Sequence, residues 1–148
     1  MKAAAWADAD GWRALVDGSG CPICTRGGPL DVIADFESVW VTASAEAQLP
    51  GYACVVSKIH VAEPYELGDE AATSFWRETM VVAQRLAEHT RAVKMNYGIH
   101  GNRIPHLHVH LWPRYPDDPY DVGGIPAGAA SFVRTTEELA AMAAAIRR

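Results

Sequence analysis

The sequence predicts an α+β fold in which an antiparallel sheet of about five strands is covered on one face by a single long helix. Segments with alternating polar and apolar residues recur between turn-forming glycines and prolines, which is typical of antiparallel strands with one buried face. The segment from Asp69 to His89 instead carries apolar residues at the three- and four-residue spacings of an amphipathic helix. Shorter helices are expected near the N-terminus and the C-terminus.

The length and composition favour a single domain that works in a reducing cytoplasm. The 148 residues form one predicted domain over 1–148, with a core at 21–114 and a C-terminal extension at 115–148. The formal net charge of −5 argues against a surface for nucleic acid polymers or anionic membranes. The first residues lack the apolar centre of a signal peptide, and no apolar run is long enough to cross a bilayer. Three cysteines do not form the even set of a disulfide scaffold.

The first half of the chain is expected to hold one short helix and three strands. Asp10 is a suitable N-cap for a helix over residues 11–17. The alternation of side chains predicts strands over 32–36, 39–42 and 52–60. Cys54 falls within the apolar run of the third strand, so it is expected to be a packing residue.

The second half begins with the long helix, for which Asp69 is the expected N-cap. Two further strands are expected over 93–100 and 106–112. Pro113 is expected to end the second of these strands because proline cannot donate a hydrogen bond to a ladder. Thr135 and Glu138 have the spacing of a capping box, which predicts a last helix through Ile146.

Three histidines, His106, His108 and His110, alternate with aliphatic residues in the strand before Pro113. Side chains of a strand point alternately to its two faces, so the imidazoles share one face and Leu107 lies on the other. The aliphatic face would pack against the long helix, and the histidine face would line a cleft. Three imidazoles in register suit a metal cluster, a nucleophile with helper groups, or one of each, and spacing alone leaves these alternatives open.

Cys21 and Cys24 form a second motif of two cysteines separated by two residues. Such a pair can bind one zinc ion, form a redox couple, or simply pack in a core. No βαβ pattern surrounds it, which weakens a thioredoxin-like interpretation.

The segment His-Leu-His-Val-His-Leu-Trp over 106–112 resembles the signature of the histidine triad family, in which histidines alternate with apolar residues. The resemblance extends over roughly 21–114. It implies the α+β fold described above and a homodimer, because members of that family usually extend one sheet across two subunits.

A second part of the resemblance lies in the strand over 52–60. Gly51, Lys58 and His60 match the family's central segment, whereas Tyr52 replaces a usual histidine and Ser57 a usual proline. In such proteins a cysteine pair often joins the histidine of this segment and the first triad histidine around a structural zinc. The resemblance therefore implies a zinc site made of Cys21, Cys24, His60 and His106.

The resemblance also implies contacts with phosphate. Asn96 matches an asparagine that contacts phosphate in the family, and Asn102 stands where a glutamine reaches a phosphate oxygen. Arg103 replaces a serine or threonine, and it either pairs with a phosphate or points into water. The family's ribose-binding aspartate would fall near Ser44, where no acidic residue matches, so no nucleoside preference is predicted. His100 is given no role in the site: it lies either at the mouth of the cleft or, more in keeping with its loop position, on the surface.

The function implied is nucleotide hydrolysis or nucleotidyl transfer at the α-phosphate. His108 would attack the α-phosphorus of a nucleotide, possible substrates including dinucleoside polyphosphates, and would form a nucleotidyl-histidine with the help of His110. Water or another acceptor would then resolve this intermediate. Two alternatives stay open: a nucleotide-binding scaffold with little turnover, and a metal-dependent hydrolase that uses the three histidines as ligands.

Overall fold

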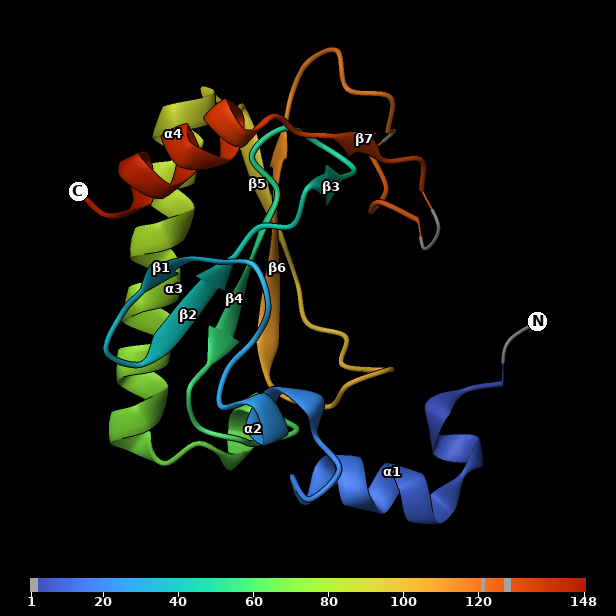
Figure 1. Ribbon diagram of the computed structural model, residues 1–148. Helices are drawn as coiled ribbons and strands as arrows, with labels where there is room; N and C mark the ends of the chain where they lie inside the picture. The colour runs from blue at the N-terminus through green and yellow to red at the C-terminus, as the bar shows by residue number, and fades with distance from the viewer. Residues whose placement is uncertain (1–2, 121, 127–128) are drawn as a thin grey trace.

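A computed structural model describes residues 3–120, 122–126 and 129–148, and it confirms the predicted α+β fold (Figure 1). The helices are α1 (Ala9–Val16), α2 (Pro22–Arg26), α3 (Asp69–Thr90) and α4 (Thr136–Ile146), with 3-10 turns η1 (Ala5–Ala7) and η2 (Pro64–Glu66). The strands are β1 (Val32–Asp35), β2 (Val39–Thr42), β3 (Glu46–Ala47), β4 (Ala53–Ser57), β5 (Lys94–Gly98), β6 (His108–Arg114) and β7 (Phe132–Val133).

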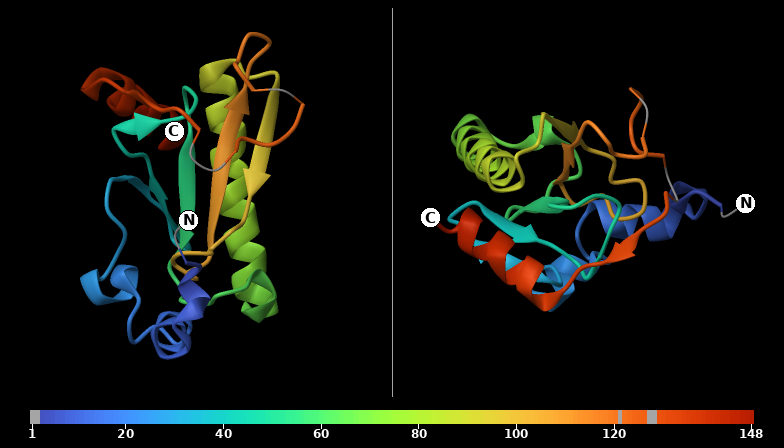
Figure 2. Two further views of the ribbon diagram at one scale, coloured as in Figure 1. Left: turned by 90° about the vertical axis from the view of Figure 1, so that its right-hand side faces the viewer. Right: turned by 90° about the horizontal axis from the view of Figure 1, so that it is seen from above.

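Five strands form one antiparallel sheet in the order β1-β2-β4-β6-β5, and β3 pairs separately with β7. The long helix α3 runs along one face of the sheet, while α1 and α2 lie towards the other face at one end of the strands (Figure 2). Strand β6 lies between β4 and β5, so His110 is opposite Cys54 on one side and Gly98 on the other. His108 is opposite Val56.

The main hydrophobic core lies between the sheet and α3, as the alternation predicted. Leu107, Val109 and Leu111 are fully buried on the helix side. They belong to one cluster with buried side chains of α3, which include Phe75, Val82 and Leu86. Burial of each such side chain contributes about 1.5–3 kcal/mol, which makes this contact the main reason for the register of β6.

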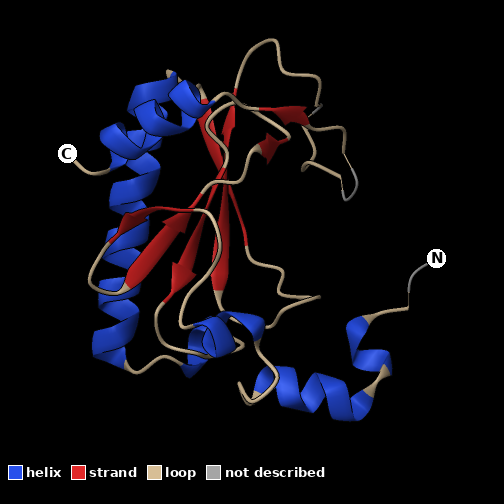
Figure 3. Ribbon diagram, viewed as in Figure 1, coloured by secondary structure: helices blue, strands red, loops and turns tan. Residues whose placement is uncertain are grey.

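Two of the predicted N-caps, Asp10 and Asp69, are displaced by two residues and by one residue. Asp8, and not Asp10, caps α1, since its Oδ1 accepts a hydrogen bond of 3.1 Å from the backbone N–H of Gly11. Gly68 precedes α3, and Asp69 lies in the first turn, where its charge favours the helix dipole. The last helix, α4, forms where the sequence predicts it and ends at Ile146 (Figure 3).

The last helix is opened by the predicted capping box. Thr135 Oγ1 accepts from the N–H of Glu138 at 3.1 Å, and the Glu138 carboxylate accepts from the N–H of Thr135 at 2.6 Å. Helix α4 then packs against α3 and β1.

Within the described residues, no helix is both long enough and apolar enough to cross a membrane.

Strand β6 starts later and ends later than predicted, since His106 precedes it and Pro113 lies inside it. The carbonyl of Arg114 accepts a hydrogen bond from Val93 on the β5 side. The nitrogen of Pro113 therefore points to the β4 side, where the ladder has already ended at Leu111 opposite Ala53. Proline costs no ladder hydrogen bond at this position, which is why the strand continues through it.

Candidate functional site

Four sulfur and nitrogen side chains from three segments meet where the histidine row begins. The possible ligand atoms of Cys21, Cys24, His60 and His106 all lie within 4.8 Å of one another. His60 Nδ1 is 3.0 Å from His106 Nδ1, and Cys24 Sγ is 3.3 Å from His60 Nδ1. Cys21 Sγ is 3.5 Å from His106 Nδ1. A tetrahedral zinc ion with two sulfur and two nitrogen ligands keeps them roughly 3.3–3.8 Å apart, so this arrangement fits zinc.

The outer nitrogens of both histidines are held by backbone carbonyl groups. His106 Nε2 donates to the carbonyl of Ser57 at 2.7 Å, and His60 Nε2 donates to that of Val16 at 2.9 Å. A carbonyl only accepts, so each Nε2 carries the hydrogen and each Nδ1 turns a lone pair towards the cysteines. Burial lowers the pKa of His106, which favours the neutral ring.

His108 is the first residue of β6, and it is only partly buried on the histidine face of the sheet. Its Nδ1 lies 2.7 Å from the backbone carbonyl of His106 and must donate to it. The hydrogen is therefore on Nδ1, and the lone pair is on Nε2 at the outer end of the ring. A neutral imidazole in this tautomer can act as a nucleophile through Nε2.

His110 follows on the same face, with its ring centroid 4.9 Å from that of His108. Its Nδ1 is 2.8 Å from the Tyr52 hydroxyl and 3.1 Å from the Cys54 sulfur. Burial, together with the positive charge that His108 and His100 can carry, lowers the pKa of His110 to about 4. The ring is therefore neutral at physiological pH.

Several residues around His110 were not assigned to the site from sequence. Cys54 packs, as predicted, but against a small second cluster that contains Val56 and not in the main core, because β4 turns it to the histidine face opposite His110. Trp112 stacks on His110 with ring centroids 5.0 Å apart. His100 is exposed, but its ring centroid lies 5.6 Å from that of His110, so it borders the site. The alternation that starts at Tyr52 was the available signal, since it places every second residue of β4 on one face.

The predicted phosphate ligands lie in two different environments. Asn96 is on β5, on the histidine face, opposite Trp112. Its Oδ1 accepts a hydrogen bond of 2.9 Å from Arg114, which only donates, so the amide nitrogen of Asn96 remains as a donor for a ligand. Asn102 and Arg103 are exposed on the loop between β5 and β6. Among the described residues, neither forms a hydrogen bond or ion pair with His108 or His110.

Solved structures with the same fold come from several bacteria. A histidine triad (HIT) protein of Sinorhizobium meliloti is 26% identical, with a TM-score of 0.71, and the match covers 78% of this chain and 86% of that one. A histidine triad protein of Marinobacter aquaeolei is 24% identical, with a TM-score of 0.69 and coverages of 78% and 85%.

A third solved structure with the same fold is described as containing zinc. It is described as a zinc-bound histidine triad family protein from Mycobacterium smegmatis, is 18% identical, has a TM-score of 0.63, and is matched over 87% of this chain and 94% of that one. Comparison with curated protein sequences gives no match. A family model described as HIT domain matches residues 26–117, which is more than half of the chain. The chain is therefore a member of the HIT domain family, whose proteins are in general nucleotide-binding proteins, hydrolases or transferases.

Proposed function

We propose that this protein is a nucleotide hydrolase or nucleotidyl transferase that acts at the α-phosphate through a covalent intermediate on His108. The observation that carries this proposal is the hydrogen bond from His108 Nδ1 to the His106 carbonyl, which leaves the lone pair on Nε2. A further support is a structural neighbour from Sulfolobus tokodaii described as a hypothetical histidine triad nucleotide-binding protein, with 17% identity and a TM-score of 0.62.

The proposed reaction has two displacements at phosphorus. The Nε2 lone pair of His108 forms a bond to the α-phosphorus, and the bond from that phosphorus to the leaving group breaks with its electron pair on the leaving group. The oxygen of water or of another acceptor then forms a bond to phosphorus and loses its proton to solvent, and the electron pair of the P–N bond returns to Nε2. Asn96, Asn102 and Arg103 would donate hydrogen bonds to the phosphate oxygens, with dinucleoside polyphosphates among the candidate substrates.

The cluster of Cys21, Cys24, His60 and His106 has a structural part in this proposal. When bound, zinc would join the N-terminal segment, the end of β4 and the start of the histidine row. His106 would thereby be held in place, and its carbonyl is the group that orients His108. The cluster thus lies next to the reaction without taking part in it.

The alternative in which all three histidines bind a catalytic metal does not fit this geometry. Nε2 of His106 is hydrogen-bonded to the Ser57 carbonyl, and Nδ1 faces the two cysteines. Nδ1 of His108 is likewise engaged with a carbonyl. His106 therefore has no nitrogen to share with His108 and His110 on one ion.

The proposal is tested by trapping the intermediate. The protein is mixed with nucleotides labelled at the α-phosphate, including dinucleoside polyphosphates, and quenched within a single turnover under alkaline conditions, because phosphohistidine is acid-labile. Digestion and mass spectrometry should place the label on His108. His108→Ala should lose roughly 10⁴-fold or more in rate.

Two results would contradict the proposed function. Label on His106 or His110, or full activity in His108→Ala, would overturn the assignment of the nucleophile. Tight nucleotide binding without turnover on any member of the panel would instead indicate the scaffold alternative.

A further inference from the structure

Tyr52 contacts His110 but has no part in the reaction proposed above. Its hydroxyl lies 2.8 Å from His110 Nδ1, and its ring is stacked against both His110 and Trp112. Cys54 completes a triangle, since its sulfur is 3.1 Å from the same nitrogen and 3.2 Å from the Tyr52 hydroxyl. Two hydrogen-bearing groups therefore converge on one ring nitrogen.

The hydrogens of this triangle can be assigned by counting donors. Burial raises the pKa of the Tyr52 phenol and raises the pKa of the Cys54 thiol to about 11, so both keep their hydrogens at neutral pH. If Nδ1 of His110 accepts from the phenol, the thiol can donate to the phenol oxygen and every hydrogen has an acceptor. If Nδ1 carried a hydrogen itself, three hydrogens would compete for two remaining acceptors. The first arrangement leaves the ring hydrogen of His110 on Nε2.

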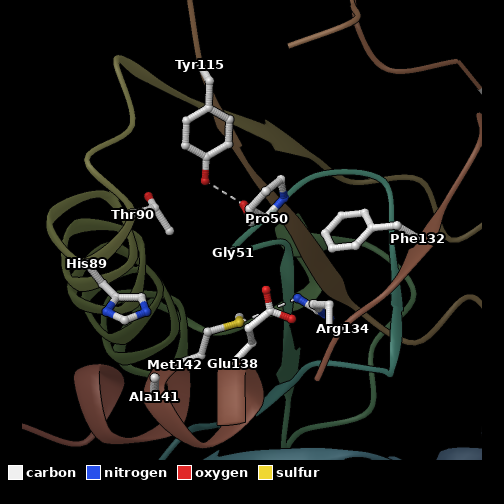
Figure 4. Close-up of a pocket in the computed structure, with 10 residues that line it drawn as sticks. All are labelled: Pro50, Gly51, His89, Thr90, Tyr115, Phe132, Arg134, Glu138, Ala141 and Met142. Atoms are coloured by element: carbon white, nitrogen blue, oxygen red, sulfur yellow. Dashed lines mark hydrogen bonds between the residues drawn. The ribbon is translucent and has the colours of Figure 1, made fainter. Parts of the chain in front are cut away.

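The backbone of Tyr52 is itself held by a residue of the C-terminal extension. Arg134 is only 4% exposed, and its Nη1 donates to the carbonyl of Tyr52 at 2.6 Å. Its Nε donates to the carbonyl of Ser44 at 3.0 Å. Figure 4 shows Arg134 beside the turn that contains Gly51, at the edge of a cavity of about 280 Å³, with its guanidinium group towards Met142 of α4. The extension is thus connected to the histidine face through Tyr52.

We propose that Tyr52 is a positioning residue that fixes His110 as a neutral donor through Nε2, with Arg134 holding the backbone of Tyr52 in place. In the reaction proposed above, the Nε2–H of His110 would donate a hydrogen bond to a phosphoryl oxygen, and no proton would be transferred. Tyr52 stands where a histidine is usual in the family pattern that this sequence resembles, so its hydroxyl is a departure from that pattern.

This role explains why a buried, neutral His110 is useful beside the nucleophile. A donor that keeps its hydrogen stabilises the charge that develops on phosphoryl oxygens, and it does so best when its orientation is set before the reaction. A ring that could change its tautomer would instead present a lone pair to those oxygens in part of the molecules. Tyr52 removes that second state.

The experiment reads the tautomer directly. In protein labelled with ¹⁵N-histidine, a long-range proton–nitrogen correlation spectrum shows which ring nitrogen of His110 carries the hydrogen, with His110→Gln used for assignment. We expect Nε2–H in the native protein. Tyr52→Phe keeps the stacked ring but removes the hydroxyl, so an Nδ1–H form should appear and kcat should fall roughly tenfold, the effect of one ordinary hydrogen bond, with KM little changed.

Tyr65→Phe is the matched control, because Tyr65 is 83% exposed and lies on η2, which is not part of the five-stranded sheet. It should change neither the spectrum nor the rate. Nδ1–H in the native protein would overturn the proposal even if Tyr52→Phe failed to fold, and so would an unchanged tautomer together with an unchanged kcat in that variant.

The inference rests on the proposed function only for the use of the hydrogen, and the two can fail separately. Loss of the Nε2–H form in Tyr52→Phe, with no nucleotidyl-His108 in the native protein, would keep the positioning role and reject the reaction. A nucleotidyl-His108 with Nδ1–H on His110 would do the reverse.

Discussion

The three histidines of one row differ in chemistry because each has a different partner on its second nitrogen. His106 gives Nε2–H to a carbonyl and turns Nδ1 to the cysteines, whereas His108 gives Nδ1–H to a carbonyl and keeps its lone pair on Nε2. His110 meets a phenol instead of a carbonyl. In the proposed function, these partners would make three identical side chains on one face a metal ligand, a nucleophile and a hydrogen-bond donor.

The first prediction concerns the metal ligands. Cys24→Ser should lower the zinc content of the purified protein from a single ion per chain and should lower its melting temperature, because a bound ion would link three segments that are distant in sequence. Metal analysis and thermal unfolding measure both effects. Cys54→Ser is the matched control, since Cys54 lies outside the cluster of four ligands. Equal zinc content in Cys24→Ser and the native protein would reject the site.

The second prediction concerns the phosphate ligands. Asn96→Ala and Asn102→Ala should each slow turnover without unfolding the domain, because a lost donor to developing charge typically costs roughly 10²-fold in kcat. For Asn96 the geometry gives a reason, since Arg114 holds Oδ1 and leaves the amide nitrogen as the donor. Steady-state kinetics and circular dichroism are the measurements. Rates within twofold of the native protein for both variants would remove them from the site.

The third prediction follows from the low pKa of His110. This group titrates near 6.5 when unfolded and at about 4 when folded, so between these values the unfolded chain binds the additional proton. Stability should therefore fall as the pH drops from 6.5 to 4. Between pH 6.5 and 4, the melting temperature of His110→Asn should fall less than that of the native protein. Any acid release of zinc would lower both, so the difference between the two curves is the measure. Parallel curves for the two proteins would show that His110 is not buried as a neutral ring.

At the scale of elements, the sequence predicts which side chains share one face of a strand. It does not predict which residues lie opposite one another on neighbouring strands. The alternation before Pro113 correctly predicts the aliphatic residues on the buried face, because the face that a side chain occupies depends only on its position along its own strand. The place of Cys54 depends on the register of β4 against β6, which is set by contacts more than fifty residues apart in sequence. The apolar sequence around Cys54 does not reveal which residue lies opposite it, so the sequence predicts a packing residue and not a neighbour of His110.

The cap of helix α1 is another feature that the sequence predicts only approximately. Asp8 and Asp10 are both acceptable caps by residue type, and only the backbone path decides that Asp8 reaches the N–H of Gly11. By contrast, the cysteine spacing and the matching histidines predict which four side chains meet in one cluster, and Cys21, Cys24, His60 and His106 do lie together. The hydroxyl of Tyr52 had no such signal, since its partner His110 lies on another strand.

At the scale of the whole molecule, one edge of the sheet carries exposed apolar side chains. Strand β5 is an edge strand, and Tyr97 on it is 48% exposed. Glu78 of α3 accepts a hydrogen bond from the N–H of Ser38, so that side of the helix faces the hairpin of β1 and β2. At 100° per residue, Trp76 and Met80 lie on the opposite side of the helix, towards β5, and are 36% and 44% exposed.

We therefore expect a homodimer in which two copies meet at β5 and the adjoining side of α3, because such a contact would cover both the apolar side chains and the unpaired strand edge. Sedimentation velocity or light scattering after size exclusion should give twice the mass of one chain. Met80→Lys places a charge in this surface and should shift the population to monomers at low concentration. Tyr65→Lys, at an exposed residue on η2, is the matched control and should leave the mass unchanged. A native protein that is monomeric at all concentrations would contradict the dimer, and a dimer insensitive to Met80→Lys would place its interface on another surface.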